Sequence, residues 1–219
     1  MTTLARKITN TGTKKNIGRF FSFKMHSLIW YESLNERNYM YLLEIDPDVL
    51  SYSTQPFKIS YILDDKVRRY TPDFLVQRQS KQQIVEIKPS SWLEDEKNVR
   101  RFPVIASSLK SLGWEFVIIT DEMMNRGSLL NNVKLLYRYA KIPLTLQNLI
   151  ICHQYFQKKL PIPLSTAINN LQTQGIDKPI LLKLIFLGFL KTDLMTQLNN
   201  NSPLYLSSQA YFAGSGEND

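Results

Sequence analysis

The first part of the chain carries short segments rich in apolar, β-branched and aromatic residues, which indicate strands, separated by longer amphipathic segments that indicate helices. A strand or an extended lead-in is expected over residues 19–30. Strands are expected over 49–63, with an interruption at Pro56, and over 67–77, 83–88 and 114–120, with a turn at Asp64-Asp65. Helices are expected over residues 33–46, 93–112 and 127–140, with a kink or break at Pro103 in the second of them. This order predicts an α/β (α+β) fold, with a mixed sheet that is flanked by helices.

A change of pattern at Lys141-Ile142-Pro143 suggests a domain boundary. Helices are then expected over residues 146–157, 164–172 and 177–186, followed by a hairpin of residues 189–194 and 203–206. Three helices and a hairpin are typical of a small winged-helix-like domain. The predicted organisation is a basic N-terminal arm over 1–19, a first domain over 20–141, a second over 142–212 and a flexible tail over 213–219.

The charge balance indicates an anionic partner. The 219 residues include 27 Lys and Arg against 19 Asp and Glu, a net charge of +8, which favours nucleic acid or a membrane surface. The longest apolar run, residues 179–190, is too short to cross a bilayer and is broken by Lys183. No secretory signal is recognisable, so a cytoplasmic, nucleoid-associated protein without a membrane partner is expected.

Cysteine and histidine are too scarce for two common kinds of site. A single cysteine, Cys152, excludes an intramolecular disulfide framework, and two histidines do not complete an ordinary structural zinc site.

Basic residues cluster in two places that could contact a DNA backbone. The N-terminal arm is either a solvated tail or a phosphate-binding segment, and the helix after residue 93 presents either a solvated face or a DNA-binding one. The candidate DNA-binding residues are Arg6, Lys7, Lys14, Lys15, Arg19, Lys97, Arg100 and Arg101.

Three charged residues lie in otherwise apolar strand-like segments, TPDFLV and VEIKP. Strand side chains alternate between faces, so Glu86 and Lys88 share one face while Val85 and Ile87 pack on the other. If the two segments form a hairpin, Asp73 projects from the same side as Glu86 and Lys88. The pattern therefore predicts two carboxylates and one ammonium in a single cluster.

Such a cluster suits a metal ion held against a phosphate. Mg²⁺ is usually bound by one or two carboxylates, with water and substrate phosphate oxygens completing its shell. Lys88 could orient or deprotonate an attacking water, or neutralise charge that develops at phosphorus. The alternative is an ordinary cross-strand salt bridge.

Glu36 is a third candidate carboxylate. It stands three residues after Ser33, in the form of a capping box, and shares a helix stripe with Met40 and Leu43. A carboxylate at the edge of the buried face can reach a site between helix and sheet. Glu32 and Glu44 are the alternatives to Glu36.

The sequence Pro72-Asp73, followed by Glu86-Ile87-Lys88, resembles the PD-(D/E)xK motif of restriction-endonuclease-like nucleases. The wider pattern ESLNERNYMYLLEIDPDVLSYSTQPF, YTPDFLV, IVEIKP and WEFVIIT resembles the TnsA-type endonuclease subunit of heteromeric cut-and-paste transposases. The resemblance covers nearly the whole chain, including a C-terminal domain of similar size and place.

That resemblance implies a metal-dependent endonuclease that cuts the 5′ ends of a mobile element at double-stranded DNA. The implied cofactor is Mg²⁺, with Mn²⁺ as a substitute. A separate DDE-type transposase would cut and join the 3′ ends, and the C-terminal domain would contact an ATPase regulator.

The resemblance also assigns individual residues. The implied catalytic set is Glu36, Asp73, Glu86 and Lys88, with Glu36, Asp73 and Glu86 as metal ligands; some members of the family have Gln at the position of Glu86. Gln55 in the segment QPF also matches the family pattern. Strand packing is its favoured role, and a place near the site is the other.

Two further functions fit the same motifs. One is a stand-alone restriction-type or junction-resolving nuclease, which would cut DNA without a partner. The other is a non-catalytic DNA-binding adaptor, against which the intact acidic and lysine set argues. The neighbouring genes would help to decide, because recombinase and ATPase genes favour transposition and CRISPR genes beside them indicate RNA-guided targeting.

Overall fold

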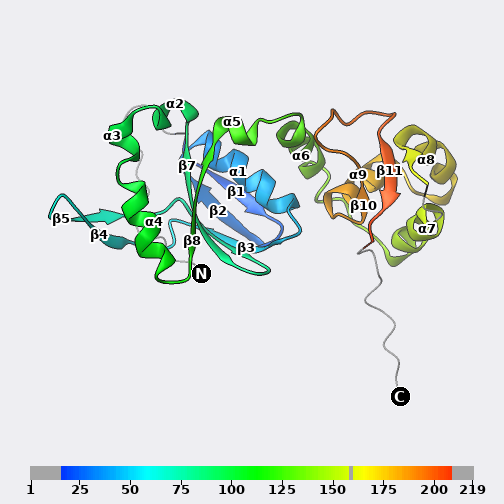
Figure 1. Cartoon of the computed structure of the whole chain (residues 1–219). Helices are drawn as coiled ribbons and strands as arrows, with labels where there is room; N and C mark the ends of the chain where they lie inside the picture. The colour runs from blue at the N-terminus through cyan, green and yellow to red at the C-terminus, as the bar shows by residue number, and fades with distance from the viewer. Residues whose placement is uncertain (1–15, 158–159, 209–219) are drawn as a thin grey trace, which may run out of the picture. The chain divides into compact units, whose positions relative to one another are not determined.

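The computed structural model describes residues 16–157 and 160–208, and of residues 97 and 98 only the backbone. The chain divides into two compact units, Met1–Arg126 and Gly127–Asp219 (Figure 1). The boundary expected near residue 141 therefore differs from the observed division, which falls before the helix predicted over 127–140.

The first unit opens with a hairpin, β1 (Gly18–Ser22) and β2 (Ser27–Tyr31), where one strand or an extended lead-in was expected over 19–30. The aromatic run is interrupted because Glu44 binds the intervening turn. Its Oε2 accepts hydrogen bonds from the backbone N–H groups of Phe23 and Lys24, at 2.8 and 3.2 Å. A long-range contact of this kind leaves no local sequence signal.

Helix α1 (Leu34–Ile45) begins and ends where the sequence predicts. Ser33 is its N-cap, and Asp46-Pro47 follows its last residue, since a residue before proline disfavours helical geometry. Met40 and Leu43 are fully buried on its inner face.

A four-stranded mixed sheet forms the centre of the first unit, as predicted. Its order is β3-β6-β7-β8, and only the β7–β8 pair is parallel. The strands are β3 (Val49–Thr54), β6 (Phe74–Arg78), β7 (Gln82–Lys88) and β8 (Glu115–Thr120). The expected restriction-endonuclease-like α+β fold is thereby confirmed.

Two of the predicted strands are each broken in two. Residues 49–63 contain β3 and a separate β4 (Ile59–Leu63), and residues 67–77 contain parts of β5 (Lys66–Tyr70) and β6. Pro56 and Pro72 lie in the breaks, where proline lacks the N–H that a ladder requires. Strands β4 and β5 instead pair with each other.

The predicted helix over 93–112 is likewise replaced by three shorter ones: α2 (Ser90–Leu93), α3 (Glu96–Val99) and α4 (Phe102–Lys110). Pro103 lies at the start of α4, where its missing N–H costs nothing, and does not kink a longer helix. Gly113 follows with a φ of 78°, the left-handed conformation that ends many helices.

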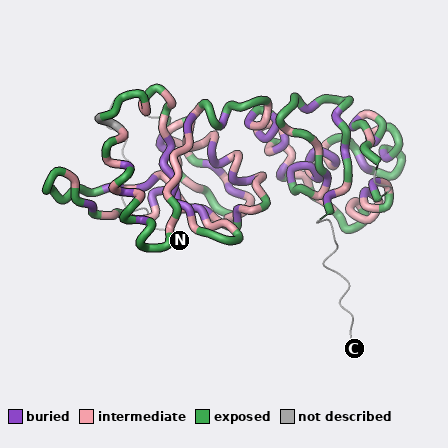
Figure 2. The backbone as a smooth tube through the Cα atoms, in the orientation of Figure 1, coloured by how far each residue is buried: buried purple, intermediate pink, exposed green. Residues whose placement is uncertain are grey.

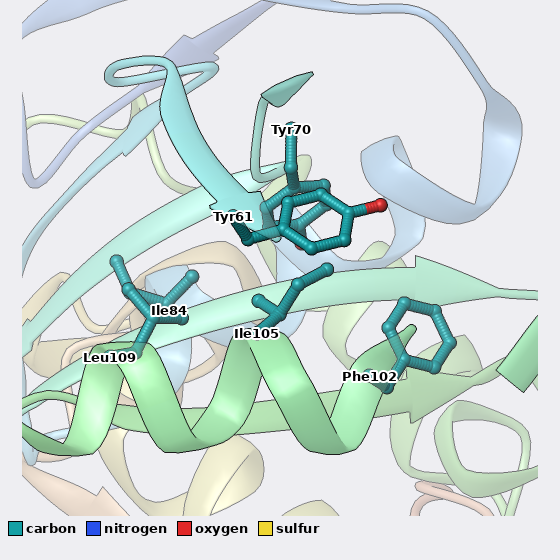
Figure 3. Packing of buried hydrophobic residues seen from close by; sticks show 6 residues of the cluster. All are labelled: Tyr61, Tyr70, Ile84, Phe102, Ile105 and Leu109. Atoms are coloured by element: carbon teal, nitrogen blue, oxygen red, sulfur yellow. The ribbon is translucent and has the colours of Figure 1, made fainter. Parts of the chain in front are cut away.

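The two faces of the sheet are covered by different helices. On one face, the ring centroids of Tyr39 from α1 and Phe74 from β6 lie 5.2 Å apart. On the other, Ile105 and Leu109 of α4 pack with Ile84 and with the tyrosines of the β4–β5 hairpin (Figure 3). The ends of β6 and β7 lie beyond these two packed regions, at the boundary between the helices and the sheet.

The second unit is mainly helical, with a small antiparallel sheet in the order β10-β11-β9. The first unit ends with the short helix α5 (Asp121–Met124). The elements of the second unit are α6 (Leu129–Tyr137), α7 (Leu146–Phe156), β9 (Ile162–Pro163), α8 (Leu164–Leu171), α9 (Lys178–Phe186), β10 (Leu190–Lys191) and β11 (Pro203–Leu206), with a 3₁₀ turn at Gln172–Gln174.

The three predicted C-terminal helices and the hairpin are thus present. The short strand β9 is also present and was not predicted from the sequence. Helix α6 is the predicted helix of residues 127–140, and it packs on α9 within the second unit. Buried residues run along the inner faces of these helices (Figure 2). Within residues 16–157 and 160–208, no helix has the length and apolar character to cross a membrane.

Candidate active site

Asp73 stands at the entrance to strand β6, directly after the break at Pro72. Its Oδ2 accepts a hydrogen bond of 2.8 Å from the backbone N–H of Ile87 on β7. Its own carbonyl accepts one of 3.0 Å from the N–H of Gln55, which follows β3. Three segments of the sheet therefore fix the position of this one carboxylate.

Glu86 and Lys88 lie on the neighbouring strand and meet Asp73 as strand alternation predicts. The Nζ of Lys88 is 2.7 Å from Oε1 of Glu86 and 3.8 Å from Oδ2 of Asp73. Phe74 pairs with Val85, so Asp73 and Glu86 occupy facing positions just beyond this pair. The side chain of Glu86 is only 3% exposed, so its charge is balanced mainly by neighbouring groups.

Glu36 comes to the same place from the first turn of α1. Its backbone N–H donates to Oγ of Ser33 at 3.1 Å, and the Ser33 hydroxyl donates to Oε1 of Glu36 at 3.0 Å. The other oxygen, Oε2, accepts the backbone N–H of Glu32 at 2.8 Å. Glu36 therefore has the expected capping role in a modified form. Its carboxylate accepts from the N–H of Glu32, the residue before the N-cap, and not from the N–H of Ser33 itself.

These side chains border a cavity of about 400 Å³ at the ends of α1 and β7. Glu36, Asp73 and Lys88 line it, and Glu32 lines it as well. Glu86 does not line the cavity, but it contacts Lys88, which does. Glu32 and Glu36, at the start of α1, therefore line the same cavity as Asp73 and Lys88 of the β6–β7 pair.

The electrostatics of the site favour protonation of two carboxyls, those of Asp73 and Glu36. Burial, together with the negative charges of Glu86 and Glu36, raises the pKa of Asp73 to about 7, although Lys88 and the Ile87 N–H act in the opposite direction. Burial also raises the pKa of Glu36, and the charge of Glu32 adds to the effect. Negative potential concentrated in this way would be relieved by a bound cation.

Two further residues, Gln55 and Tyr70, belong to the surroundings of this site. Oε1 of Glu32 accepts a 2.9 Å hydrogen bond from Nε2 of Gln55, so Gln55 lies near the site while also shaping the end of β3. Tyr70, the last residue of β5 before the break at Pro72, donates its hydroxyl proton to Oε2 of Glu86. The positive φ of Gln55, 46°, is unusual for a residue with a side chain, but only the structure reveals it.

Glu44, the other alternative considered for the third acid, has a different role. Its Oε1 accepts hydrogen bonds from the hydroxyls of Ser22 and Tyr52, at 2.6 and 2.7 Å. With the N–H groups of the β1–β2 turn also bound to it, this carboxylate fastens the hairpin to α1.

The residues present are compatible with Mg²⁺ as the implied ion. Within the described parts of the chain, no three acidic, histidine or cysteine side chains already converge as a metal-binding group. Lys88 lies between Asp73 and Glu86 and separates their charges. Mg²⁺ needs only one or two carboxylates when water and phosphate complete its shell, and the cavity offers Asp73 with Glu36 or Glu86 nearby.

The predicted DNA-binding residues are divided among several places. Arg6, Lys7, Lys14 and Lys15, and the side chain of Lys97, lie outside the described residues. Arg19 is exposed on β1, with its guanidinium 5.1 Å from the centroid of a Trp30 ring. Arg100 and Arg101 lie together between α3 and α4 and line a second cavity, described below.

Comparison with known families agrees with the resemblance inferred from the sequence. Residues 46–121 match the model of the family described as TnsA-like endonuclease N terminal. The matched segment contains Gln55, Asp73, Glu86 and Lys88, whereas Glu36 precedes it. A search of curated proteins gives no match. The match supports a transposition-related nuclease, and with it DNA and a transposase as partners in general terms.

Proposed function

We propose that this TnsA-type chain, with its TnsA-like endonuclease region at residues 46–121, cuts the 5′ ends of a mobile DNA element in a Mg²⁺-dependent reaction. A separate DDE-type transposase cuts and joins the 3′ ends. The observation that carries the proposal is the convergence of Glu36, Asp73 and Lys88 on one cavity, with Glu86 directly behind the lysine.

The reaction is hydrolysis of a phosphodiester, in which water adds to phosphorus and one P–O bond breaks. Asp73, with Glu36 or Glu86, would hold Mg²⁺, which supplies Lewis-acid polarisation of the phosphate and a more acidic bound water. Asp73 is oriented for this role by the Ile87 N–H. Lys88 presents a fixed positive charge at the cavity wall, where negative charge increases in the transition state.

The second unit is proposed to provide contacts with the rest of the transposition machinery. Its helices and three-stranded sheet contain none of the proposed catalytic residues, all of which belong to the first unit. An ATPase regulator is the partner proposed for it, and the winged-helix interpretation of this unit stays a prediction.

Substitution of Asp73 or Lys88 tests the catalytic assignment. In a reaction reconstituted with the partner transposase, Asp73→Asn and Lys88→Ala are expected to reduce Mg²⁺-dependent 5′ cutting by at least about 100-fold, since each removes a charge at the reacting phosphate. Denaturing gels with end-labelled strands measure the 5′ and 3′ cuts separately.

Lys110→Ala is the matched control for Lys88→Ala, because Lys110 is an exposed lysine at the end of α4. It is expected to cut like the unsubstituted protein. Normal 5′ cutting by either active-site variant would contradict the catalytic assignment. Efficient cutting of DNA without any partner would instead favour the stand-alone nuclease.

A further inference from the structure

A second cavity, of about 340 Å³, lies where the β4–β5 hairpin approaches helices α2 to α4. Three arginines line it: Arg68, Arg100 and Arg101. Tyr61 and Trp92 supply aromatic walls, and among the described residues of the lining only Asp64 is acidic. A concave, aromatic and predominantly cationic surface of this kind suits an anionic ligand.

Arg68 is directed into this cavity by the register of the β4–β5 hairpin. It pairs with Tyr61, and residues that face each other across antiparallel strands project from the same side. In the described parts of the chain, Arg68 makes neither a hydrogen bond nor an ion pair. Its guanidinium donors are therefore available to a ligand.

Arg101 reaches the cavity from the start of α4 and is held in place by aromatic rings. Its guanidinium carbon lies 5.5 Å from the centroid of a Trp92 ring and 5.1 Å from that of Phe102. Its Nε is buried without a hydrogen-bond partner among the described residues. A buried donor left in this condition is costly, so a ligand that accepts from the guanidinium would stabilise the site.

Arg100 contributes less, because its guanidinium is already hydrogen-bonded to Asp64, whereas Arg101 and Glu86 are 3.8 Å apart, beyond hydrogen-bond distance. It forms an ion pair with Asp64, and both side chains are largely exposed, at 65% and 47%. An exposed pair of this kind is weak and can exchange partners at small cost. Arg68 and Arg101 are therefore the main donors that this cavity offers to a ligand.

Glu86 and Trp92 connect the arginine cavity to the candidate active site, because each contacts both Lys88 and Arg101. Oε1 of Glu86 lies 2.7 Å from Nζ of Lys88 and 3.8 Å from a terminal nitrogen of Arg101. Trp92 is likewise within 5.5 Å of both Lys88 and Arg101. Only the carboxylate of Glu86 and the ring of Trp92 therefore lie between an anion bound by the arginines and Lys88.

We propose that the arginine cavity, defined by Arg68, Arg100, Arg101, Tyr61 and Trp92, binds a phosphodiester group of DNA close to the one that is cut. The proposal rests on the proposed function, because it assigns a second contact to the same substrate. Arg68 and Arg101 offer forked donors that match two phosphate oxygens. The bound phosphate would set the position of the strand relative to Asp73 and Lys88.

An acidic segment of a partner protein is the alternative ligand for this cavity. DNA is favoured because the cavity adjoins the residues proposed to cut DNA and because aromatic walls beside arginines are typical of nucleic-acid sites. The two ligands predict different outcomes in the following experiment.

The test compares two adjacent arginines on strand β5. Arg68 lines the cavity, whereas Arg69 is exposed and pairs with Ser60 on the other face of the hairpin. Binding of the full-length protein to a fluorescent DNA duplex is measured by anisotropy in EDTA, so that no cutting occurs. The measurement is repeated from about 50 to about 200 mM salt.

Arg68→Ala is expected to weaken binding about tenfold and to make the dependence of log K on log salt less steep by about one. Arg69→Ala is expected to bind within about twofold of the unsubstituted protein, since an exposed charge away from the ligand is largely screened. Arg68→Lys is expected to keep the salt dependence and lose part of the affinity, because it keeps the charge without the fork. Unchanged thermal unfolding of Arg68→Ala confirms that folding is intact.

Equal effects of Arg68→Ala and Arg69→Ala would overturn the proposal. So would normal DNA binding by Arg68→Ala together with loss of transposase binding, which would identify an acidic protein segment as the ligand. Neither result would affect the catalytic assignment, which is decided separately by the 5′ cutting of Asp73→Asn.

Discussion

At the scale of single residues, the most consequential feature is the burial of Asp73 beside other acids. A carboxylate that is held near Glu86 and Glu36 raises the free energy of the folded state whenever it is ionised. Such an arrangement is common at functional sites, where stability is reduced in favour of chemistry. Its effect should therefore be visible in the pH dependence of unfolding.

The pKa of Asp73 predicts that the first unit loses stability as the pH rises from about 4 to about 7. The folded protein holds the proton up to pH about 7, whereas an unfolded aspartate releases it near 3.8, so ionisation disfavours folding across this interval. Asp73→Asn removes the effect. In chelator at pH 8, its unfolding midpoint is expected to be higher than that of the unsubstituted protein by about 5 °C.

Tryptophan fluorescence measures this transition selectively, because Trp30, Trp92 and Trp114 all belong to the first unit. At pH 4 the difference between the two proteins should disappear. Addition of Mg²⁺ at pH 8 should raise the midpoint of the unsubstituted protein only. A difference that is independent of pH would contradict the assigned pKa, and equal stabilisation by Mg²⁺ would exclude Asp73 as a ligand.

At the scale of single elements, the start of α1 combines capping with positioning of Glu36. The Ser33 hydroxyl both accepts from the Glu36 N–H and donates to the Glu36 carboxylate. A cap of this kind usually contributes about 1 kcal/mol to stability. Here the Ser33 cap also orients the Glu36 side chain toward the cavity.

Ser33→Ala is therefore expected to lower the free energy of unfolding by about 1 kcal/mol and to reduce 5′ cutting more than this loss of stability explains. Urea unfolding followed by tryptophan fluorescence gives the first quantity, and the reconstituted reaction gives the second. Ser33→Thr keeps a hydroxyl at the same place and should restore both. Full cutting by Ser33→Ala at a temperature well below its unfolding midpoint would show that Glu36 needs no positioning by the cap.

Elements were predicted best where local rules decide them. The α1 cap, β7, β8 and the Asp64-Asp65 turn follow from neighbouring residues, and both turn residues adopt the positive φ, 54° and 55°, that suits a two-residue hairpin turn. The interruption at Pro56 was expected, whereas the break at Pro72 was not. A proline signals that a ladder must stop, but only the packing of the β4–β5 hairpin on α4 shows where the chain goes next.

At the scale of the whole molecule, α6 belongs with the C-terminal elements. Asn132 of this helix is buried, and its Nδ2 donates to the carbonyls of Leu194 and Thr196, while its Oδ1 accepts the N–H of Leu198 at 3.0 Å. Val133 and Leu136 are fully buried beside it. These contacts explain why the division falls before α6.

Fragments of the chain test this division. A fragment of residues 127–219 is expected to unfold cooperatively, whereas a fragment of residues 142–219 should be less stable by at least about 3 kcal/mol, because it lacks the buried side chains and the Asn132 hydrogen bonds of α6. Circular dichroism during heating measures both. Equal midpoints for the two fragments would contradict the observed division and restore the boundary near residue 141.

The sequence by itself determined the chemistry-bearing residues of the β6–β7 pair and the mixed sheet that carries them. Strand alternation, proline positions and helix caps act over a few residues, so they can be read from local patterns. The tertiary structure decided which acids line the cavity, that Glu44 holds a hairpin, and that Arg68 and Arg101 meet beside Glu86. These outcomes depend on contacts between distant segments, whose free energies no local pattern contains.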